Sequence, residues 1–171
     1  MVLLETERLY LRSFNSGDLD SYYGFISKEE VYTWLGNRSK RTVEQARKLL
    51  EYFESELKRN SYGVYAVIEK ENNRLIGQAG FNYLKDLEKI EYLYALDPAA
   101  WGKGYATEVG KCLIDYYSKR YPETELIALA YEGNIRSNNV LNKLGFISKG
   151  TKEIFGSTLE YFEREKKRNV T

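Results

Sequence analysis

The sequence predicts a single α+β domain over residues 1–171, in which helices flank a mixed, mostly antiparallel sheet of about seven strands. The first supporting observation is the local pattern. Short stretches of alternating or continuously apolar residues, typical of strands, are interspersed with longer stretches whose apolar residues recur at helical spacing. The second is their order, because helices and strands mix along the chain without a linker or a repeat. A chain of 171 residues can bury one core without disulfides.

The N-terminal half predicts three helices between a first strand and three further strands. Asn15 or Ser16 can cap the first helix, and Thr42 with Gln45 three residues later forms a capping box for the third. The pair 72–73, Asn-Asn, supplies a turn between two antiparallel strands. The expected elements are a strand over 6–13, helices over 15–26, 29–35 and 42–59, and strands over 62–69, 75–83 and 90–96.

The C-terminal half predicts a helix, a strand, a second helix and two closing strands. The first helix carries an apolar stripe that includes Val109 and Leu113. The stretch 125–131 is apolar enough for a strand covered on both faces, as a parallel neighbour would be. Asn134 suits the start of the second helix and Gly145 its end. The expected elements are a helix from 106 that ends before Pro122, a helix over 134–144, and strands over 125–131, 146–155 and 158–165.

A glycine-rich stretch, 97–108, joins a strand to the first of these helices. The first turn of a helix leaves backbone N–H groups unpaired and carries the positive end of the helix dipole, so a phosphate fits there. Gly102, Gly104 and Ala106 alternate along the turn, so little side chain separates a diphosphate from the backbone. Lys103 adds a cation. The pattern indicates an anion site, although a glycine-rich turn without a ligand remains open for this stretch alone.

Two common phosphate-binding motifs do not match the stretch. A Walker loop requires Gly, four residues and then Gly-Lys-Ser/Thr, but Asp97 stands five residues before Gly102, and Gly104 follows the lysine. The dinucleotide fingerprint requires a third glycine where Thr107 stands, and it normally lies in the first strand–helix unit. Neither a Walker nucleotide site nor a dinucleotide site of this type therefore fits the stretch.

The stretch resembles motif A of the Gcn5-related N-acetyltransferase (GNAT) superfamily, whose diphosphate-binding turn reads Arg/Gln-x-x-Gly-x-Gly/Ala. Here residues 101–108 read Trp-Gly-Lys-Gly-Tyr-Ala-Thr-Glu, and Trp101 departs from the usual first residue in the manner of the RimJ/RimL branch. Residues 134–146 resemble motif B of that branch, with Asn139 where relatives often carry Arg. Residues 5–12 resemble the opening of the same branch, so the resemblance covers nearly the whole chain.

The resemblance implies the GNAT fold, in which strands 4 and 5 run parallel and splay apart around the pantetheine arm of acetyl-CoA. It implies acetyl-CoA as cofactor, CoA as product, and no metal. Backbone N–H groups near the end of the preceding strand would contact the acetyl carbonyl and the pantetheine. The implied cofactor-binding residues are Ala95, Leu96, Trp101, Gly102, Lys103, Gly104, Tyr105, Ala106, Thr107 and Asn134.

Direct acetyl transfer to an amine requires a base for the amine and a proton for the departing thiolate. Glu91 is the first choice for the base, directly or through water, because it matches the glutamate of the branch pattern Glu-x-Gly-Tyr, whose glycine is Leu93 here. A solvent-facing strand residue remains the alternative, and Glu160 is a second candidate base. Ser137 resembles the serine proposed to protonate the thiolate, and helix capping is an equal alternative for it.

Composition narrows the function classes. Lys and Arg total 26 against 25 Asp and Glu, so no nucleic-acid or membrane partner is expected, and the basic tail 166–168 is expected to be a solvated terminus. The absence of His excludes Ser-His-Asp and Cys-His catalysts and argues against a zinc site. The single cysteine, Cys112, is expected to be a packed filler. Early charges and the lack of about 18 consecutive apolar residues predict a cytoplasmic protein.

The leading functional hypothesis is an acetyl-CoA-dependent N-acetyltransferase that acts on a protein N-terminal α-amine or on a small-molecule amine. The alternative is a CoA-binding sensor or structural module that lost turnover. In the superfamily the early helices border the acceptor site, so Tyr22, Tyr32 and Trp34 are candidate substrate contacts, with core packing the favoured interpretation. The sequence specifies neither the acceptor nor whether the protein is a monomer or a homodimer.

Overall fold

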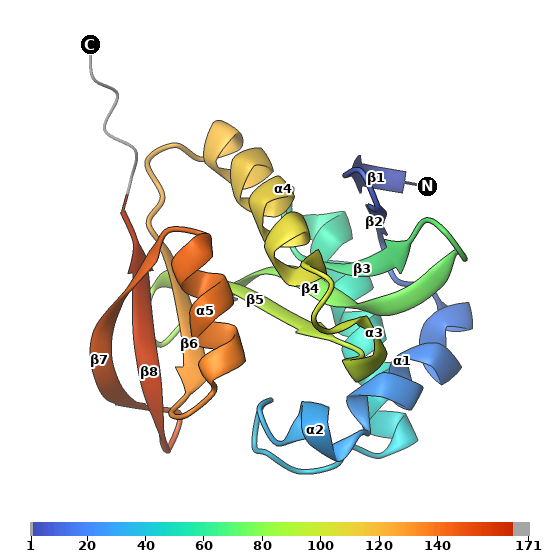
Figure 1. Ribbon diagram of the computed structural model, residues 1–171, viewed down its shortest axis with the longest axis horizontal. Helices are drawn as coiled ribbons and strands as arrows, with labels where there is room; N and C mark the ends of the chain where they lie inside the picture. Colours follow the sequence, from blue (N-terminus) through green and yellow to red (C-terminus); the bar gives the residue numbers. More distant parts are fainter. Residues whose placement is uncertain (1, 166–171) are drawn as a thin grey trace.

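The computed structural model describes residues 2–165, which form one sheet of eight strands flanked by helices (Figure 1). Neighbouring strands follow the order β1-β2-β3-β4-β5-β6-β8-β7, so the predicted mixed α+β fold is confirmed. The basic tail 166–168 lies outside the described residues. The strands are β1 (Val2–Glu5), β2 (Leu9–Arg12), β3 (Val64–Glu69), β4 (Arg74–Leu84), β5 (Lys89–Leu96), β6 (Leu126–Tyr131), β7 (Phe146–Ile154) and β8 (Ser157–Arg164). The helices are α1 (Leu19–Ile26), α2 (Glu29–Tyr32), α3 (Val43–Arg59), α4 (Tyr105–Arg120) and α5 (Ile135–Lys143).

The sheet opens between β5 and β6, its one parallel pair among the described strands. Ladder pairing joins Ile90 to Leu126 and Glu91 to Ile127 and then stops. Because β5 continues to Leu96 and β6 to Tyr131 without further pairing, the two strands splay apart toward their carboxyl ends. The expected splayed parallel pair is confirmed. It becomes strands 5 and 6 because the N-terminus adds a strand.

That additional strand corrects the prediction of one strand over 6–13. The segment is the second half of a hairpin, in which β1 and β2 run antiparallel and Glu5 faces Tyr10. Thr6 closes the turn by donating its N–H to the Leu9 carbonyl at 2.9 Å. The turn, Thr6-Glu7-Arg8, contains no Gly, Pro, Asn or Asp, so no turn signal in the sequence reveals the reversal. The helix predicted over 29–35 is also shorter and ends at Tyr32.

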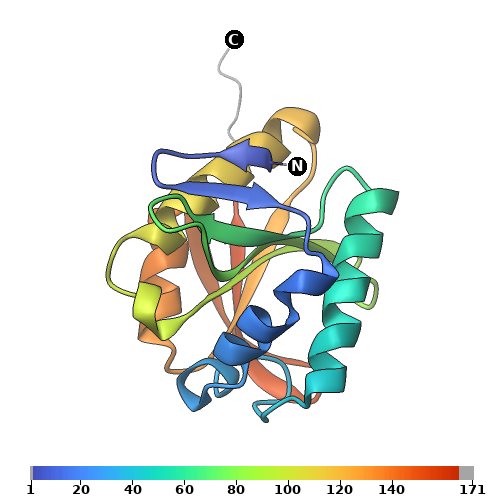
Figure 2. The same ribbon diagram turned by 90° about the vertical axis from the view of Figure 1, so that its right-hand side faces the viewer.

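The helices cover the sheet in two layers, with α1 and α3 on one face and α4 and α5 on the other (Figures 1 and 2). We call these the α1/α3 face and the α4/α5 face. Strand β5 contributes to both cores, because successive side chains of a strand point to opposite faces. Tyr92 and Leu96 belong to the core under α4 and α5, and Ala95 belongs to the core under α1 and α3.

Local capping explains where the helices begin. The predicted capping box of α3 is confirmed: Gln45 N–H donates to the Thr42 hydroxyl at 3.2 Å, and Thr42 N–H donates to the Gln45 side chain at 2.9 Å. Asn134 caps α5 by accepting from the Ser137 N–H at 3.3 Å. Gly145 ends the α5 segment with a φ of 86°, a left-handed conformation that favours glycine.

Candidate functional site

The glycine turn leads the chain from the end of β5 into α4. A short 3₁₀ turn, Pro98–Ala100, follows β5, and Asp97 caps it by accepting from the Ala99 N–H at 3.1 Å. Gly102 and Gly104 have φ values of 73° and 81°, which other residues rarely adopt. The helix then starts at Tyr105, so the turn brings the positive end of the α4 dipole beside the open part of the sheet.

The amides of this turn are free to bind a ligand. Within residues 2–165, no group accepts a hydrogen bond from the N–H groups of residues 102–107. A Cβ built at Gly102 meets nothing within 4 Å, so the turn faces open space. Gly102, Lys103 and Gly104 are exposed. A row of unpaired amides at a helix N-terminus is a ready site for a phosphate or diphosphate.

The side chains around the turn have mostly structural contacts. Trp101 donates its indole N–H to the Leu96 carbonyl at 2.9 Å, and the Arg136 guanidinium lies 4.4 Å from the centre of its ring. Tyr105 is buried and donates its hydroxyl to the Glu69 carboxylate at 2.7 Å. Ala106 and Thr107 are partly buried in the first turn of α4. At these last three positions, therefore, the side chains are partly or fully buried while the backbone amides have no partner among the described residues.

An ion pair and several hydrogen bonds join the N-terminal hairpin to this turn. These contacts, which we call the hairpin lock, were not predicted from the sequence. The Glu108 carboxylate accepts from the Thr6 hydroxyl at 2.6 Å and pairs with the Arg8 guanidinium at 2.6 Å. Arg8 also donates to the Lys103 carbonyl at 2.9 Å and lies over the Tyr105 ring. These partners are about a hundred residues apart in the chain, so no local pattern could reveal the contact.

At the end of β5, every second peptide group faces the gap between β5 and β6. Asp97 N–H donates to the Ile76 carbonyl of β4 at 2.8 Å, so the peptide N–H of Ala95, two residues earlier, also points toward β4. The peptide groups of Leu96 point away from β4, and its carbonyl accepts from the Trp101 indole N–H. Of the two amides predicted here, that of Leu96 faces the gap between β5 and β6, whereas that of Ala95 pairs within the sheet.

The start of α5 and strand β5 each contribute one hydroxyl on the α4/α5 face of the gap. The Ser137 hydroxyl is hydrogen-bonded to the hydroxyl of Tyr94, which comes from β5. Burial raises the pKa of Tyr94, and the hydrogen bond from Ser137 partly opposes that rise. Asn134 uses its side-chain oxygen to cap α5, and its amide nitrogen has no partner among the described residues. Both predicted roles of Asn134, as cap and as ligand contact, are therefore geometrically compatible.

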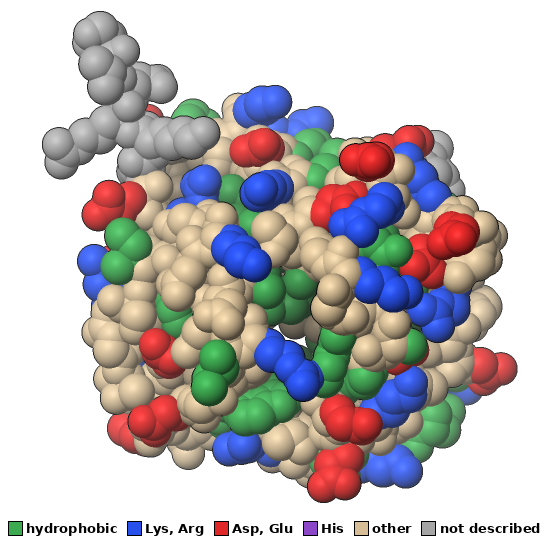
Figure 3. Space-filling view, in the orientation of Figure 1, with side chains coloured by type: hydrophobic (Ala, Val, Ile, Leu, Met, Phe, Trp, Pro, Cys, Tyr) green, Lys and Arg blue, Asp and Glu red, His purple; other side chains and the backbone are tan. Residues whose placement is uncertain are grey.

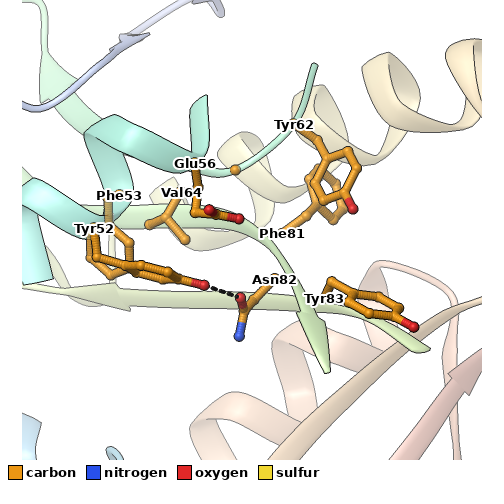
Figure 4. Close-up of a pocket in the computed structure, with 9 residues that line it drawn as sticks. Tyr52, Phe53, Glu56, Tyr62, Val64, Phe81, Asn82 and Tyr83 are labelled. Carbon is orange, nitrogen blue, oxygen red and sulfur yellow. Dashed lines mark hydrogen bonds between the residues drawn. The ribbon is translucent and has the colours of Figure 1, made fainter. Parts of the chain in front are cut away.

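Glu91 lies on the opposite face. It alternates along β5 with Tyr92, so its side chain points to the same face as Ala95, the α1/α3 face. The carboxylate has no hydrogen-bond or ion-pair partner among residues 2–165, and desolvation raises its pKa to about 7. Its neighbour across the sheet is Asn82, which accepts from the Tyr52 hydroxyl at 3.2 Å (Figure 4). A carboxyl with such a pKa can exchange protons near neutral pH.

The second candidate base, Glu160, is already engaged. Its carboxylate accepts from the Asn138 amide at 2.6 Å and from the Ser148 hydroxyl at 2.9 Å. These bonds tie α5 to β7 and β8. Because both oxygens have partners, Glu160 is better suited to position α5 than to accept a proton from a substrate.

The remaining residues singled out from the sequence lie either among packed side chains or at the partly exposed end of α2. Tyr22 is fully buried and donates to the Gln78 side chain at 2.7 Å, whereas Tyr32 and Trp34 are partly exposed near the end of α2. Cys112 is partly buried, and burial raises its thiol pKa, the opposite of what a nucleophile requires. Packing therefore explains Tyr22 and Cys112.

Two hollows help to locate a ligand. Figure 3 shows a hollow in the surface between the half of the molecule that carries β6 and α5 and the half that carries α1 and α2. By contrast, the cavity between α3 and the end of β4 has a volume of about 10 Å³ and holds at most a water molecule (Figure 4). The small cavity therefore has no room for a ligand, and the aromatic residues around it serve as packing residues.

Metal and membrane features are not found in the part of the chain that the structure describes. No cluster of three or more His, Cys, Asp or Glu residues there is arranged to hold a metal ion. None of the described helices combines the length and the apolar character that crossing a membrane requires.

Comparisons with known proteins agree with this geometry. A family model described as "Acetyltransferase (GNAT) domain" matches residues 8–147. The chain is 30% identical over 151 residues to the "Uncharacterized N-acetyltransferase p20" of Bacillus licheniformis, covering 88% of this chain and 85% of that protein. An acetyltransferase structure from Agrobacterium tumefaciens superimposes with a TM-score of 0.83 at 20% identity, covering 95% of this chain and 93% of the other. RimL, a ribosomal L7/L12 α-N-protein acetyltransferase solved with coenzyme A, superimposes with a TM-score of 0.79 at 17% identity, covering 96% and 97%.

Proposed function

Because this chain belongs to the GNAT acetyltransferase family, we propose that it transfers an acetyl group from acetyl-CoA directly to a primary amine. The amine is a protein N-terminal α-amine, as for RimL, or an amine of a small molecule. The observation that carries the proposal is the row of unpaired amides over residues 102–107, beside the gap between β5 and β6.

The residues present fit coenzyme A. Bound acetyl-CoA would supply a thioester whose acetyl carbon an amine attacks. The amides of residues 102–107 would hold its diphosphate, with Lys103 as a nearby cation. The Asn134 amide nitrogen would donate to the pantetheine arm, and the Leu96 N–H would donate to the acetyl oxygen as negative charge develops there.

The two faces of the sheet separate the two proton transfers. On the α1/α3 face, the Glu91 carboxylate would accept the proton that the attacking amine loses as the new C–N bond forms. On the α4/α5 face, the hydroxyl pair of Tyr94 and Ser137 would donate a proton to the sulfur as the C–S bond breaks. The amine and the cofactor would therefore approach the gap from opposite sides, which keeps base and acid apart.

Substitution of the hydroxyl pair tests the acid assignment. We expect Tyr94→Phe to lower kcat by roughly 10- to 100-fold with little change in the Kd for acetyl-CoA, because general acid catalysis contributes on that scale. Ser137→Ala should lower kcat less if Tyr94 is the final donor. Steady-state kinetics and calorimetry give the two values. Unchanged kcat in both variants would leave the hydroxyl pair a purely structural contact between α5 and β5.

The hairpin lock predicts a second effect, on cofactor affinity. Arg8→Gln removes the ion pair with Glu108 and the bond to the Lys103 carbonyl, so the glycine turn becomes less ordered. We expect the KM for acetyl-CoA to rise several-fold at unchanged kcat, and stability to fall by about 1 kcal/mol, since the pair is partly exposed. Lys70→Gln breaks an ion pair with Glu5 in the same hairpin and is the control. An equal rise in KM for the control would contradict the lock.

The function itself is tested by incubating the folded protein with acetyl-CoA and a panel of N-terminal peptides and small primary amines. Free CoA and an acetylated amine, detected by a thiol reagent and mass spectrometry, are the expected products. Calorimetry with acetyl-CoA alone separates the alternatives. Tight binding without transfer to any acceptor would favour the CoA-binding sensor, and absence of binding would refute the proposal.

A further inference from the structure

One guanidinium of the α1/α3 face lacks a partner. The Nη1 atom of Arg41 is buried, and no group of the described residues accepts a hydrogen bond from it. Arg41 also forms no ion pair within residues 2–165, although the side chain is only partly exposed. A partly buried guanidinium without a counter-charge is costly, so this group is expected to have a partner in the working protein.

Arg41 lies near the open end of the gap between β5 and β6. Its Nη2 atom lies 2.8 Å from the point where a Cβ of Gly36 would be, and the Gly36 carbonyl accepts from the Tyr131 hydroxyl at the end of β6. Arg41 is also close enough to Tyr22 for its charge to act on that hydroxyl, which is bonded to Gln78 of β4. The guanidinium thus lies between the carboxyl end of β6 and the side of the sheet formed by β4 and β5.

The segment around Arg41 closes this end of the molecule. In Figure 1, α2 and the loop after it lie beneath β5, beside the lower ends of β6 and α5. Arg38 holds the loop in place, because its guanidinium lies 4.5 Å from the centre of the Tyr131 ring and 5.4 Å from that of Trp34. The loop is therefore docked on β6, and Arg41 is held at the splayed end of the sheet.

The charge around Arg41 is of one sign. A groove of about 390 Å³ opens between this loop and the first turns of α3, a volume suited to a small ligand. Three cations and no acidic residue line it, which favours anions. The lining residues are Asn37, Ser39, Lys40, Arg41, Gln45, Lys48 and Leu49.

We propose that Arg41 recognises an oxyanion on the acetyl acceptor, so that the substrate is an amine that also carries a carboxylate or a phosphate. This inference rests on the proposed acetyl transfer and deepens it by naming the class of acceptor. Arginine suits the role because its planar guanidinium binds both oxyanions through two parallel hydrogen bonds. Glu91 is on the same face, so an acceptor anchored through Arg41 can direct its nitrogen into the gap.

The test compares acceptors that differ only in the oxyanion. The pairs are β-alanine against β-alaninamide, phosphoethanolamine against ethanolamine, and a Ser-Glu peptide amide against its Ser-Gln twin. We expect the anionic member of at least one pair to have a kcat/KM higher by about tenfold or more, as for a charge-assisted hydrogen bond. The pair that shows the preference distinguishes a carboxylate from a phosphate and a free amine from a peptide. Equal rates within all three pairs would overturn the proposal.

Arg41→Gln should abolish the preference while the KM for acetyl-CoA stays within about twofold, because the side chain lies on the acceptor face. Arg41→Lys should restore only part of it, since lysine keeps the charge without the planar pair of donors. Arg47→Gln is the matched control, because Arg47 is an exposed arginine of α3 that pairs with Glu44 at 3.5 Å. Removing an unpaired cation should leave the melting temperature unchanged or higher. A lower melting temperature with equal losses for both members of each pair would show a structural role instead.

Binding of the reaction products separates this inference from the proposed function. Calorimetry in the presence of CoA should detect N-acetyl-β-alanine, O-phospho-N-acetylethanolamine or the acetylated Ser-Glu peptide, but not the neutral twin, and Arg41→Gln should remove the difference. If that difference is present while no acceptor is acetylated, the oxyanion site stands and the proposed catalysis fails. If acetylation occurs but neither the rates nor the binding distinguish the twins, the oxyanion site is refuted and the catalysis stands.

Discussion

Gly104→Val is expected to raise the Kd for acetyl-CoA by at least about a hundredfold, because it acts on the diphosphate site in two ways. Gly104 has a φ of 81°, so a β-branched residue there is strained and shifts the backbone out of the conformation that exposes the amides. Its side chain would also stand beside the row of free N–H groups. Isothermal titration calorimetry with acetyl-CoA, on protein verified as folded by circular dichroism, measures the change.

Gly150→Val is the matched control. Gly150 has a φ of 86°, a built Cβ there meets nothing within 4 Å, and the residue belongs to β7, away from the glycine turn. Both substitutions therefore carry similar backbone strain, of roughly 1–3 kcal/mol. Only the change at Gly104 should affect cofactor affinity. Loss of affinity in both variants, or in neither, would show that the turn does not hold the diphosphate.

Glu91→Gln is expected to lower kcat/KM for the acceptor by roughly 100- to 1,000-fold, as the loss of a general base does, with little change in the Kd for acetyl-CoA. In the wild type, kcat/KM should rise with pH and level off above about 7, because the carboxyl must be deprotonated to accept a proton and desolvation raises its pKa to about 7. In Glu91→Gln, kcat/KM should not show this rise with pH. Initial rates between pH 5.5 and 9 provide the comparison.

Stability gives an independent measure of the same group. The pKa of Glu91 is about 7 when folded, against an ordinary value of 4.5, so the folded state holds the proton more tightly. Between these values the folded protein binds more protons than the unfolded chain, and the free energy of unfolding therefore falls as pH rises through this window. At pH 8, Glu91→Gln should be more stable than the wild type by on the order of 2–3 kcal/mol. At pH 4 the two should be similar.

Glu160→Gln separates the two candidate bases. Its carboxylate holds Asn138 and Ser148, so its loss should lower stability and leave the pH profile of kcat/KM in place. If the profile instead disappears in Glu160→Gln and persists in Glu91→Gln, the roles are reversed.

The order of most helices and strands and the glycine turn before α4 could be predicted from the sequence, because both depend on neighbours close in the chain. The capping box of Thr42 and Gln45, the cap at Asn134 and the stop at Gly145 are satisfied within a few residues and appear in the structure as predicted. The N-terminal hairpin was missed because its turn, Thr6-Glu7-Arg8, carries none of the residues that usually mark a turn.

The sequence alone determined that a strand runs into a glycine turn and a helix whose first amides have no local partner, since glycine and helix geometry act over a single turn. Only the tertiary structure decided what surrounds that turn. The packing of distant segments joins Arg8 to Glu108, decides which helices cover each face of β5, occupies Glu160 with other partners and leaves Arg41 unpaired. Such contacts depend on strand register and on the docking of loops, which short-range residue patterns do not encode.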